Sequence, residues 1–185
     1  MKARRVKGLD PAGPLADALE RIIRVRLGEL QGFVPRALDP AEVDALHDLR
    51  IAAKRLRYLL ELGGHLFGPY AKVAAGRAKD LQDLVGEVHD CDVLLPRVRG
   101  LVTEAEARAA ALVRERAGRA RDVEPALAAD LPEADAWPGL HALAVFLTAR
   151  RALLFKRFCG LWVELEREGL RPRLEYALAE RADPA

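Results

Sequence analysis

The chain has few aromatic residues, two cysteines and no long apolar run. Aromatic side chains make up 5% of the sequence, so base-stacking platforms for single-stranded nucleic acid are scarce. Cys91 and Cys159 form no short metal-ligand motif and are too few for a disulfide framework. No stretch approaches the roughly 18 consecutive apolar residues of a membrane span. A transmembrane protein and a disulfide-stabilised secreted domain are therefore disfavoured.

The sequence also lacks a strong excess of charge. Thirty basic residues face 28 acidic ones, for a formal net charge of +2. A role in binding anions must therefore rest on local clusters of cations rather than on bulk charge. The first ten residues contain no apolar core of a signal peptide, and we expect a cytoplasmic location.

The residues that are abundant favour helices. Ala, Leu, Arg and Glu dominate, and 51% of the 185 positions are hydrophobic, enough to bury a core. We predict an all-α fold, an antiparallel helical bundle of about six to seven helices with a basic inner groove. A basic, disordered arm is expected over residues 1–12, and a single helical domain over residues 13–185.

Capping signals, prolines and glycines set the expected helix boundaries. Asp39, Pro40 and Glu42 are typical of a helix start, with Asp39 as N-cap. Pro35 is expected to stop the preceding helix, Gly86 to interrupt a later one, and Pro96 to start or kink the segment after that. The expected helices are 14–33, 40–62, 69–85, 90–102, 104–131 with a break at Pro125, 140–168 and 171–180, with a loop over 130–139.

The second expected helix carries the most function-like pattern. At about 100° per residue, His47, Arg50, Lys54 and Arg57 share an arc of roughly 80°, which we call the cationic stripe. On one side lies an apolar face made of Leu46, Leu49, Ala52, Ala53, Leu56, Leu59 and Leu60. On the other side lie further apolar residues, so we predict that the cationic stripe lines a groove between helices.

Two other expected helices carry arginines within apolar arcs. Arg26 falls among Leu15, Leu19, Ile22 and Leu30. Arg150 and Arg157 fall among Leu143, Phe146, Leu154 and Leu161. Burying an unpaired guanidinium costs several kcal/mol, so each must reach water, pair with a carboxylate or face an anionic ligand. Internal salt bridges and an anion-binding groove both remain open at this point.

Two segments together resemble a known family. "HDLRIAAKRLRYLLEL" at 47–62 has a His, an Arg three residues later and a basic cluster. "KDLQDLVGEVHDCDVLL" at 79–95 has the Lys, Leu-Gln, apolar-Gly and Asp-x-Asp-Val pattern. Together these segments resemble the conserved histidine α-helical domain family, called CHAD.

The resemblance implies a helical bundle whose basic inner surface binds inorganic polyphosphate, without catalysis or a cofactor. It also implies association with polyphosphate granules, and phosphate or sulfate is expected to be able to occupy the same site. Within the second segment, the resemblance favours Lys79 as a residue that contacts polyphosphate. The helical repeat instead places Arg77 on the inner face of its helix, together with Tyr70, Val73 and Leu84. Both residues are carried as candidates.

The second half of the chain departs from the family pattern. Such domains usually have two similar helical halves, but here His141 is followed by Ala144 where an Arg would be expected. The second half is also short. We therefore expect either a partly open groove or a homodimer.

Three rival functions remain, and the third of them is a plain helical scaffold. A helical metal-dependent phosphohydrolase would use His47-Asp48 and His89-Asp90, with Asp92 or Asp122, as ligands of a divalent ion. Against it, Asp48 lies about 100° from His47 around the helix and beside Arg55. A nucleic-acid-binding module would use the same basic groove, but only Tyr58 interleaves with the cationic stripe.

Overall fold

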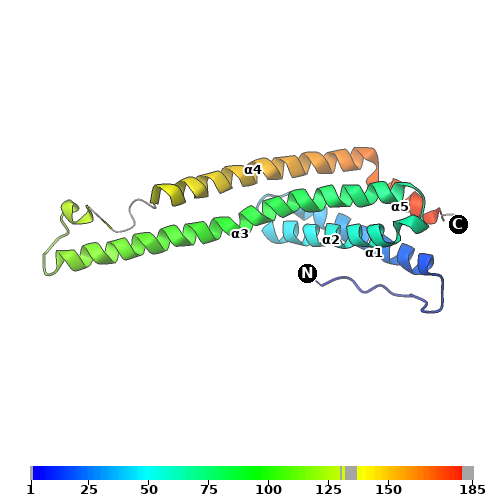
Figure 1. Ribbon diagram of the computed structural model, residues 1–185, viewed down its shortest axis with the longest axis horizontal. Helices are drawn as coiled ribbons and strands as arrows, with labels where there is room; N and C mark the ends of the chain where they lie inside the picture. Colours follow the sequence, from blue (N-terminus) through cyan, green and yellow to red (C-terminus); the bar gives the residue numbers. More distant parts are fainter. Residues whose placement is uncertain (1, 130, 132–136, 181–185) are drawn as a thin grey trace. The chain divides into compact units, whose positions relative to one another are not determined.

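The computed structural model describes residues 2–129, 131 and 137–180. This part of the chain contains five α-helices, two 3₁₀ turns and no strand, which confirms the predicted all-α class (Figure 1). The elements are α1 (Leu15–Ala37), α2 (Val43–Gly63), η1 (Gly64–Leu66), α3 (Tyr70–Ala117), η2 (Pro125–Ala128), α4 (Trp137–Glu168) and α5 (Leu170–Ala179).

The helix count is lower than expected because three predicted segments join into α3. This helix runs without a break for 48 residues through Gly86 and Pro96. A glycine inside a helix costs about 1 kcal/mol and a proline about 3 kcal/mol. Val85 and Val88 around the glycine, and Leu95 and Val98 around the proline, are buried. Burial of these side chains offsets the local cost, so the expected breaks do not occur.

Pro35 does not end α1 either. The helix continues to Ala37, and the backbone N–H of Leu38 still donates to the carbonyl of Val34 at 3.0 Å. Val34 and Ala37 are both buried, which stabilises the last turn despite the hydrogen bond that the proline cannot donate.

The expected N-cap of α2 forms a turn instead. The carboxylate of Asp39 accepts a hydrogen bond from the N–H of Ala41 at 2.9 Å, two residues ahead, as in an Asx turn. Glu42, the expected partner in a capping box, instead forms an ion pair with Arg36 of α1. The α-helix therefore begins at Val43, three residues later than predicted.

The later boundaries differ in detail. The polar helix expected over 104–131 ends at Ala117, and Pro125 begins η2. Most of the loop expected over 130–139 lies outside the described residues, and α4 begins within its last part, at Trp137. Gly169 separates α4 from α5 with φ of 73°, a left-handed conformation that favours glycine.

Contacts divide the chain into two units, one made of residues 1–89 and 153–185 and the other of residues 90–152. The first unit contains α1, α2, the first part of α3, the last part of α4, and α5. Its core includes the fully buried Ile23, Leu49, Leu81 and Phe158. The second unit is an antiparallel hairpin of the remaining parts of α3 and α4. Within the described residues, no helix has both the length and the hydropathy that a bilayer span needs.

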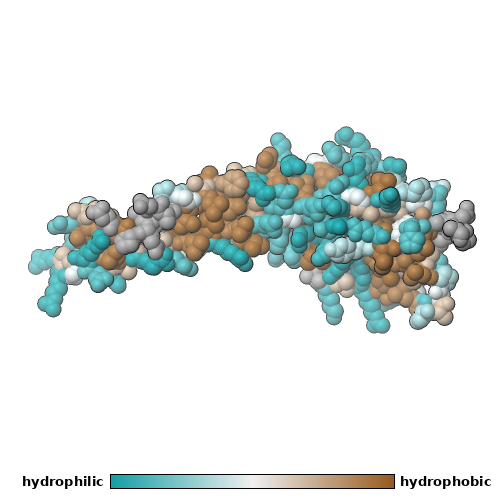
Figure 2. Space-filling model, in the orientation of Figure 1, coloured by the Kyte–Doolittle hydropathy of each residue, from teal (hydrophilic) through white to brown (hydrophobic). Residues whose placement is uncertain are grey.

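The apolar face predicted for α2 is confirmed. Leu46, Leu49, Ala52, Ala53, Leu56 and Leu60 are buried, and Leu59 is half-buried. The arc predicted for α4 is only partly correct: Leu154 is buried, but Leu143 and Phe146 are exposed. Figure 2 shows apolar side chains at the surface over this hairpin of α3 and α4.

Residues 2–12 form no helix, but specific contacts hold part of this arm against α1. The N–H of Arg4 donates to the Glu29 carboxylate, and Arg26 donates to the carbonyl of Arg4 at 3.0 Å. Farther along, Arg21 donates to the carbonyl of Lys7 at 3.4 Å. The division of the chain at residue 12 and the single domain after it stay predictions.

Two leucines of α2 test this assignment of the core. Leu49 is fully buried, whereas Leu62 on the same helix is 71% exposed. We expect Leu49→Ala to lower the free energy of unfolding by about 2–5 kcal/mol, because it leaves a cavity. Leu62→Ala should change it by less than about 0.5 kcal/mol. Urea denaturation followed by circular dichroism measures both, and equal losses would contradict the assignment.

Candidate functional site

The cationic stripe of α2 lies against α3. The rings of His47 and His89 are 4.6 Å apart, with an angle of 42° between their planes. Farther along, Arg57 donates to the side-chain carbonyl of Gln82 at 3.5 Å. Residue numbers rise along α2 as they fall along α3, so the two helices are antiparallel. His47 and Arg57 therefore contact residues of α3, and the groove between helices stays a prediction.

Arg50 crosses α3 at Gly86. A Cβ atom at Gly86 would lie 3.2 Å from Nε of Arg50, closer than nine in ten Cβ contacts. Gly86 is buried and lies inside a continuous helix, so it does not interrupt the chain. Its missing side chain instead leaves room for the side chain of Arg50. The glycine lets the Arg50 side chain pass close to the α3 backbone.

Two nitrogen atoms of the cationic stripe are buried without a hydrogen-bond partner in the described structure. They are Nδ1 of His47 and Nε of Arg50. Buried polar atoms are almost always satisfied by protein, water or a ligand. No carboxylate partner of His47, Arg50 or Lys54 is found among the described residues.

Two members of the cationic stripe, Lys54 and Arg57, lie near the ring of Tyr58. The Lys54 ammonium lies 5.7 Å from the centre of the Tyr58 ring, and the Arg57 guanidinium lies 5.3 Å from it. Arg57 also pairs with Glu61 at 2.7 Å, and this hydrogen bond raises the pKa of Arg57. Arg57 is thus the one member of the cationic stripe with a described carboxylate partner, and the pair is partly exposed.

The two candidates on α3 have acidic partners. Lys79 pairs with Asp83 one turn away at 2.6 Å, and both side chains are about half exposed. Arg77 forms a bidentate ion pair with Glu168 of α4. Its Nε donates to Oε2 at 3.0 Å, and its Nη2 donates to Oε1 at 2.5 Å. Arg77 therefore links α3 to α4, and Lys79 is the more accessible of the two.

Arg26 is held in a structural ion pair. Its guanidinium lies 2.6 Å from the carboxylate of Glu29, whose side chain is 1% exposed. The backbone N–H of Arg4 binds the same carboxylate. The guanidinium of Arg26 therefore compensates the buried negative charge of Glu29. Its hydrogen bond to the carbonyl of Arg4 also holds the N-terminal arm against α1.

Arg157 and Arg150 lie in different surroundings. Arg157 lines a hollow of about 560 Å³ in the first unit, and this hollow is otherwise mainly acidic. Its other lining residues are Asp80, Asp83, Leu84, Glu87, Gly160, Leu161 and Glu164. Arg150 belongs to the second unit, where its Nη1 lies 3.5 Å from the sulfur of Cys91.

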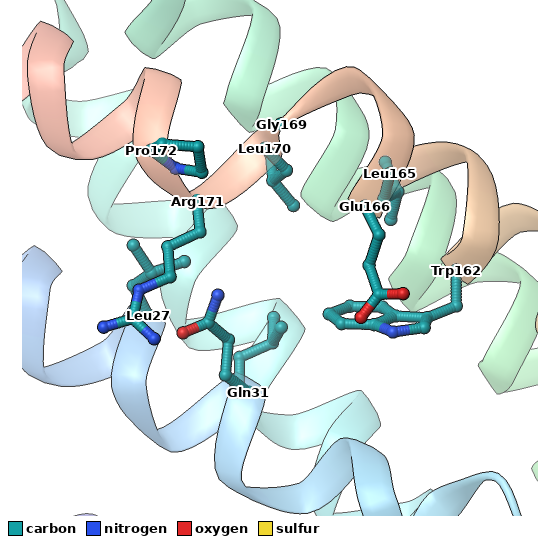
Figure 3. Close-up of a pocket in the computed structure, with 10 residues that line it drawn as sticks. Leu27, Gln31, Trp162, Leu165, Glu166, Gly169, Leu170, Arg171 and Pro172 are labelled. Atoms are coloured by element: carbon teal, nitrogen blue, oxygen red, sulfur yellow. The ribbon is translucent and has the colours of Figure 1, made fainter.

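A second hollow, of about 280 Å³, lies between α1, α4 and α5 (Figure 3). Leu27, Leu30, Trp162 and Leu165 give it an apolar lining. Its one cation is Arg171, which pairs with Glu175 at 2.9 Å. The chemistry of this hollow does not suit a polyanion.

The described residues contain no group of three or more His, Cys, Asp or Glu side chains placed to hold a metal ion. Asp92, one of the ligands of the phosphohydrolase alternative, is bound by Arg151 through both carboxylate oxygens. This pair is largely buried, so the Asp92 carboxylate is committed to an ion pair.

Sequence reasoning missed two residues of this site. The sequence places His89 only in the phosphohydrolase alternative and Gln82 only in the second family motif, yet both lie beside the cationic stripe. Gln82, Gly86 and His89 are spaced four and three residues apart, the spacing of one helix face. That spacing was the available signal, but an unbroken helix through Gly86 was needed to recognise it.

Together the fold and the site define an all-helical protein with cations arranged along the contact of two antiparallel helices. The sequence model of one family, described as the CHAD domain, matches residues 2–99, slightly more than half of the chain. The chain therefore belongs to the CHAD domain family, as the resemblance implied. Comparison with curated proteins and with solved structures gives no match.

Two glycines of α3 test the contact between Arg50 and Gly86. A Cβ atom at Gly76 would have no neighbour within 4 Å, whereas one at Gly86 would meet Arg50. Gly76→Ala should stabilise the protein by up to about 1 kcal/mol through helix propensity. Gly86→Ala should raise the free energy of unfolding by measurably less than Gly76→Ala, because the Arg50 side chain must shift to make room for the new Cβ atom. Equal gains in urea denaturation would show that Arg50 does not lie against this glycine.

Proposed function

We propose that this protein binds inorganic polyphosphate through the cationic stripe of α2. The observation that carries the proposal is that His47, Arg50, Lys54 and Arg57 follow one side of α2, and that only Arg57 has a described carboxylate partner. Membership of the CHAD family, which is linked to polyphosphate, supports the same substrate class.

The proposed mechanism is electrostatic. Polyphosphate is a flexible chain with roughly one negative charge for each internal phosphate. Cations spaced three or four residues apart on a helix recur about every 5 Å along its axis, so several phosphates can be bound at once. Arg50 and Arg57 supply forked donors for charge-assisted hydrogen bonds, Lys54 a point charge, and His47 a ring N–H. The shape of a base or a sugar plays no part.

The candidate residues outside α2 are expected to contribute less to binding than the cationic stripe. Lys79 is exposed enough to reach a bound chain if it exchanges Asp83 for phosphate. The other four candidates have different surroundings. Arg26 and Arg77 pair with carboxylates, Arg150 contacts the sulfur of Cys91, and Arg157 lines a mainly acidic hollow. Binding of polyphosphate by these four residues stays a prediction. A basic inner groove made by all these residues together also stays a prediction.

The proposal extends to activity and location. We propose that the protein binds without catalysis, because the cationic stripe contains no activated nucleophile and supplies cations rather than metal-ligating carboxylates. A cytoplasmic protein of this kind would be recruited to polyphosphate granules by binding alone.

Removal of three cations tests the binding site. We expect Arg50→Ala/Lys54→Ala/Arg57→Ala to weaken binding of long-chain polyphosphate by roughly tenfold or more, because three charge-assisted contacts are lost. The slope of log K against log salt concentration should fall by about 2, following counterion release as in nucleic acids. Fluorescence anisotropy over a salt series measures both quantities.

The matched control removes three exposed arginines that belong to the second unit rather than to α2. Arg114→Ala/Arg119→Ala/Arg121→Ala changes the net charge by the same amount, and all three residues are exposed. This control should bind like wild type. If both triple variants lose affinity equally, general charge rather than the cationic stripe explains binding.

A competition experiment separates the rival functions. We expect tRNA and duplex DNA to displace labelled polyphosphate only at much higher phosphate concentration, because stacking platforms are scarce. We also expect no release of orthophosphate from polyphosphate with Mg²⁺ or Mn²⁺, as measured by a colorimetric assay. Metal-dependent release that is lost in His47→Ala and His89→Ala would instead establish the phosphohydrolase.

A further inference from the structure

The N-terminal arm is held against α1 by its backbone rather than by its cationic side chains. The N–H of Arg4 donates to the carboxylate of Glu29, and the carbonyl of Arg4 accepts a hydrogen bond from Arg26 at 3.0 Å. Farther along, the carbonyl of Lys7 accepts a hydrogen bond from Arg21 at 3.4 Å. Glu29 is only 2% exposed, and a buried carboxylate is costly unless its partners stay in place. These contacts therefore favour an arm that keeps its position on α1.

Gly8 lies at the end of the held part of the arm. Its φ is 71°, a left-handed conformation that favours glycine. A Cβ atom at this position would lie 2.5 Å from Nη1 of Arg21, the same atom that binds the carbonyl of Lys7. The close passage of the arm across Arg21 therefore needs a residue without a side chain. Figure 1 shows the arm running beside α1 before the chain turns into that helix.

The held arm presents four cations to solvent. Their side chains are all exposed, and none has a hydrogen-bond or ion-pair partner among the described residues. These residues are Lys2, Arg4, Arg5 and Lys7. Between them, Ala3 and Val6 are half-buried, so the small and apolar residues of the arm face the protein. A row of cations without carboxylate partners, on a backbone fixed by other contacts, is suited to binding an anion.

Two contacts establish the register of α1 against α2. Near the connection between the helices, Arg36 forms an ion pair with Glu42. At the other end, a Cβ atom at Gly63 would lie 2.5 Å from the side chain of Leu19. Residue numbers therefore rise along α1 as they fall along α2, and the two helices form an antiparallel hairpin.

This register brings the arm to the level of the cationic stripe. Between the two contacts, Glu29, which binds Arg4, lies at about the level of Ile51 of α2. Lys7 lies about two turns farther along the hairpin, near the level of Leu60. The arm contacts α1, and α1 packs against the helix that carries the cationic stripe. The arm and the cationic stripe are therefore separated by at most two helix diameters, on the order of 20 Å.

We propose that the N-terminal arm is a second polyphosphate-binding segment, which a long chain reaches while it is bound to the cationic stripe. This proposal rests on the proposed function. The second contact is intramolecular once the chain is bound to the cationic stripe, so it adds affinity without a second encounter. An arm that is already held in place also loses less conformational freedom on binding than a flexible tail. Tripolyphosphate is too short to reach both segments, so the arm should matter for long chains only.

Removal of three side chains of the arm tests this proposal. Lys2→Ala/Arg5→Ala/Lys7→Ala keeps the backbone contacts, and Arg4 is left unchanged. Binding of long-chain polyphosphate is expected to weaken by roughly tenfold, and the slope of log K against log salt concentration should fall by about 2. Tripolyphosphate should compete with a labelled short chain equally well for this variant and for wild type. Fluorescence anisotropy measures all three quantities.

The possible outcomes separate this proposal from the proposed function. Arg114→Ala/Arg119→Ala/Arg121→Ala removes the same charge from the second unit and should bind long chains like wild type. An equal loss in this control would overturn a specific role of the arm. If the variant of the cationic stripe loses affinity and the arm variant does not, the proposal about the arm alone fails. If wild type binds no polyphosphate, both proposals fail.

Other polyanions are a further outcome of the same experiment. The arm variant is also titrated with tRNA and with vesicles that contain phosphatidylglycerol. If its affinity for one of these falls while its affinity for long-chain polyphosphate stays that of wild type, the arm binds a different polyanion and the proposal is overturned.

Release of the arm without loss of charge tests the held conformation. Gly8→Ala is strained at a φ of 71° and displaces the Arg21 guanidinium, so trypsin should cleave after Lys7 severalfold faster. Long-chain affinity should fall by about two- to fivefold with an unchanged salt slope, because every cation remains. Gly32→Ala is the control, since a Cβ atom there meets Arg4 only at 3.9 Å. Faster cleavage with unchanged affinity would contradict a role for the held arm.

Discussion

The close approach of α2 and α3 at Arg50 and Gly86 determines how the candidate site is built. Because Gly86 has no side chain, the Arg50 side chain passes beside the α3 backbone. The same approach brings His47 to His89 and Arg57 to Gln82. A larger residue at Gly86 would move the two helices apart or turn Arg50 outward. The position of the Arg50 side chain against α3 therefore depends on the missing Cβ atom of Gly86.

The cations of this chain divide into two groups by their partners. Arg26, Arg77 and Arg151 each bind a carboxylate that is buried or partly buried, and they hold helices or the N-terminal arm in place. His47, Arg50 and Lys54 have no described carboxylate partner, although acidic residues are almost as numerous as basic ones. An anionic ligand would offset the cost of the half-buried Arg50, whose Nε has no described partner, since an isolated ionised group is costly to hold in a partly buried place. The division into two groups is also the reason why an arginine count alone predicts the site poorly.

The hairpin of the second unit raises a different physical problem. Burial in a pair of helices is one-sided, and most of α4 between residues 140 and 149 is apolar around its whole circumference. A helix of this composition is usually covered on several sides. The sequence assigned Phe146 to the core because its arc contains other apolar residues. The structure leaves it exposed because Leu147 and Leu154 take the buried positions.

The sequence by itself determined the helical class, the buried face of α2 and the grouping of the cationic stripe, because these follow from composition and the helical repeat. It did not determine whether Gly86, Pro96 and Pro35 break their helices, since the outcome depends on burial around each residue. Nor did it determine that Glu29 binds Arg26, that Glu168 binds Arg77, or that His89 lies beside His47. Contacts between different helices depend on their register and crossing, which only the packed structure sets.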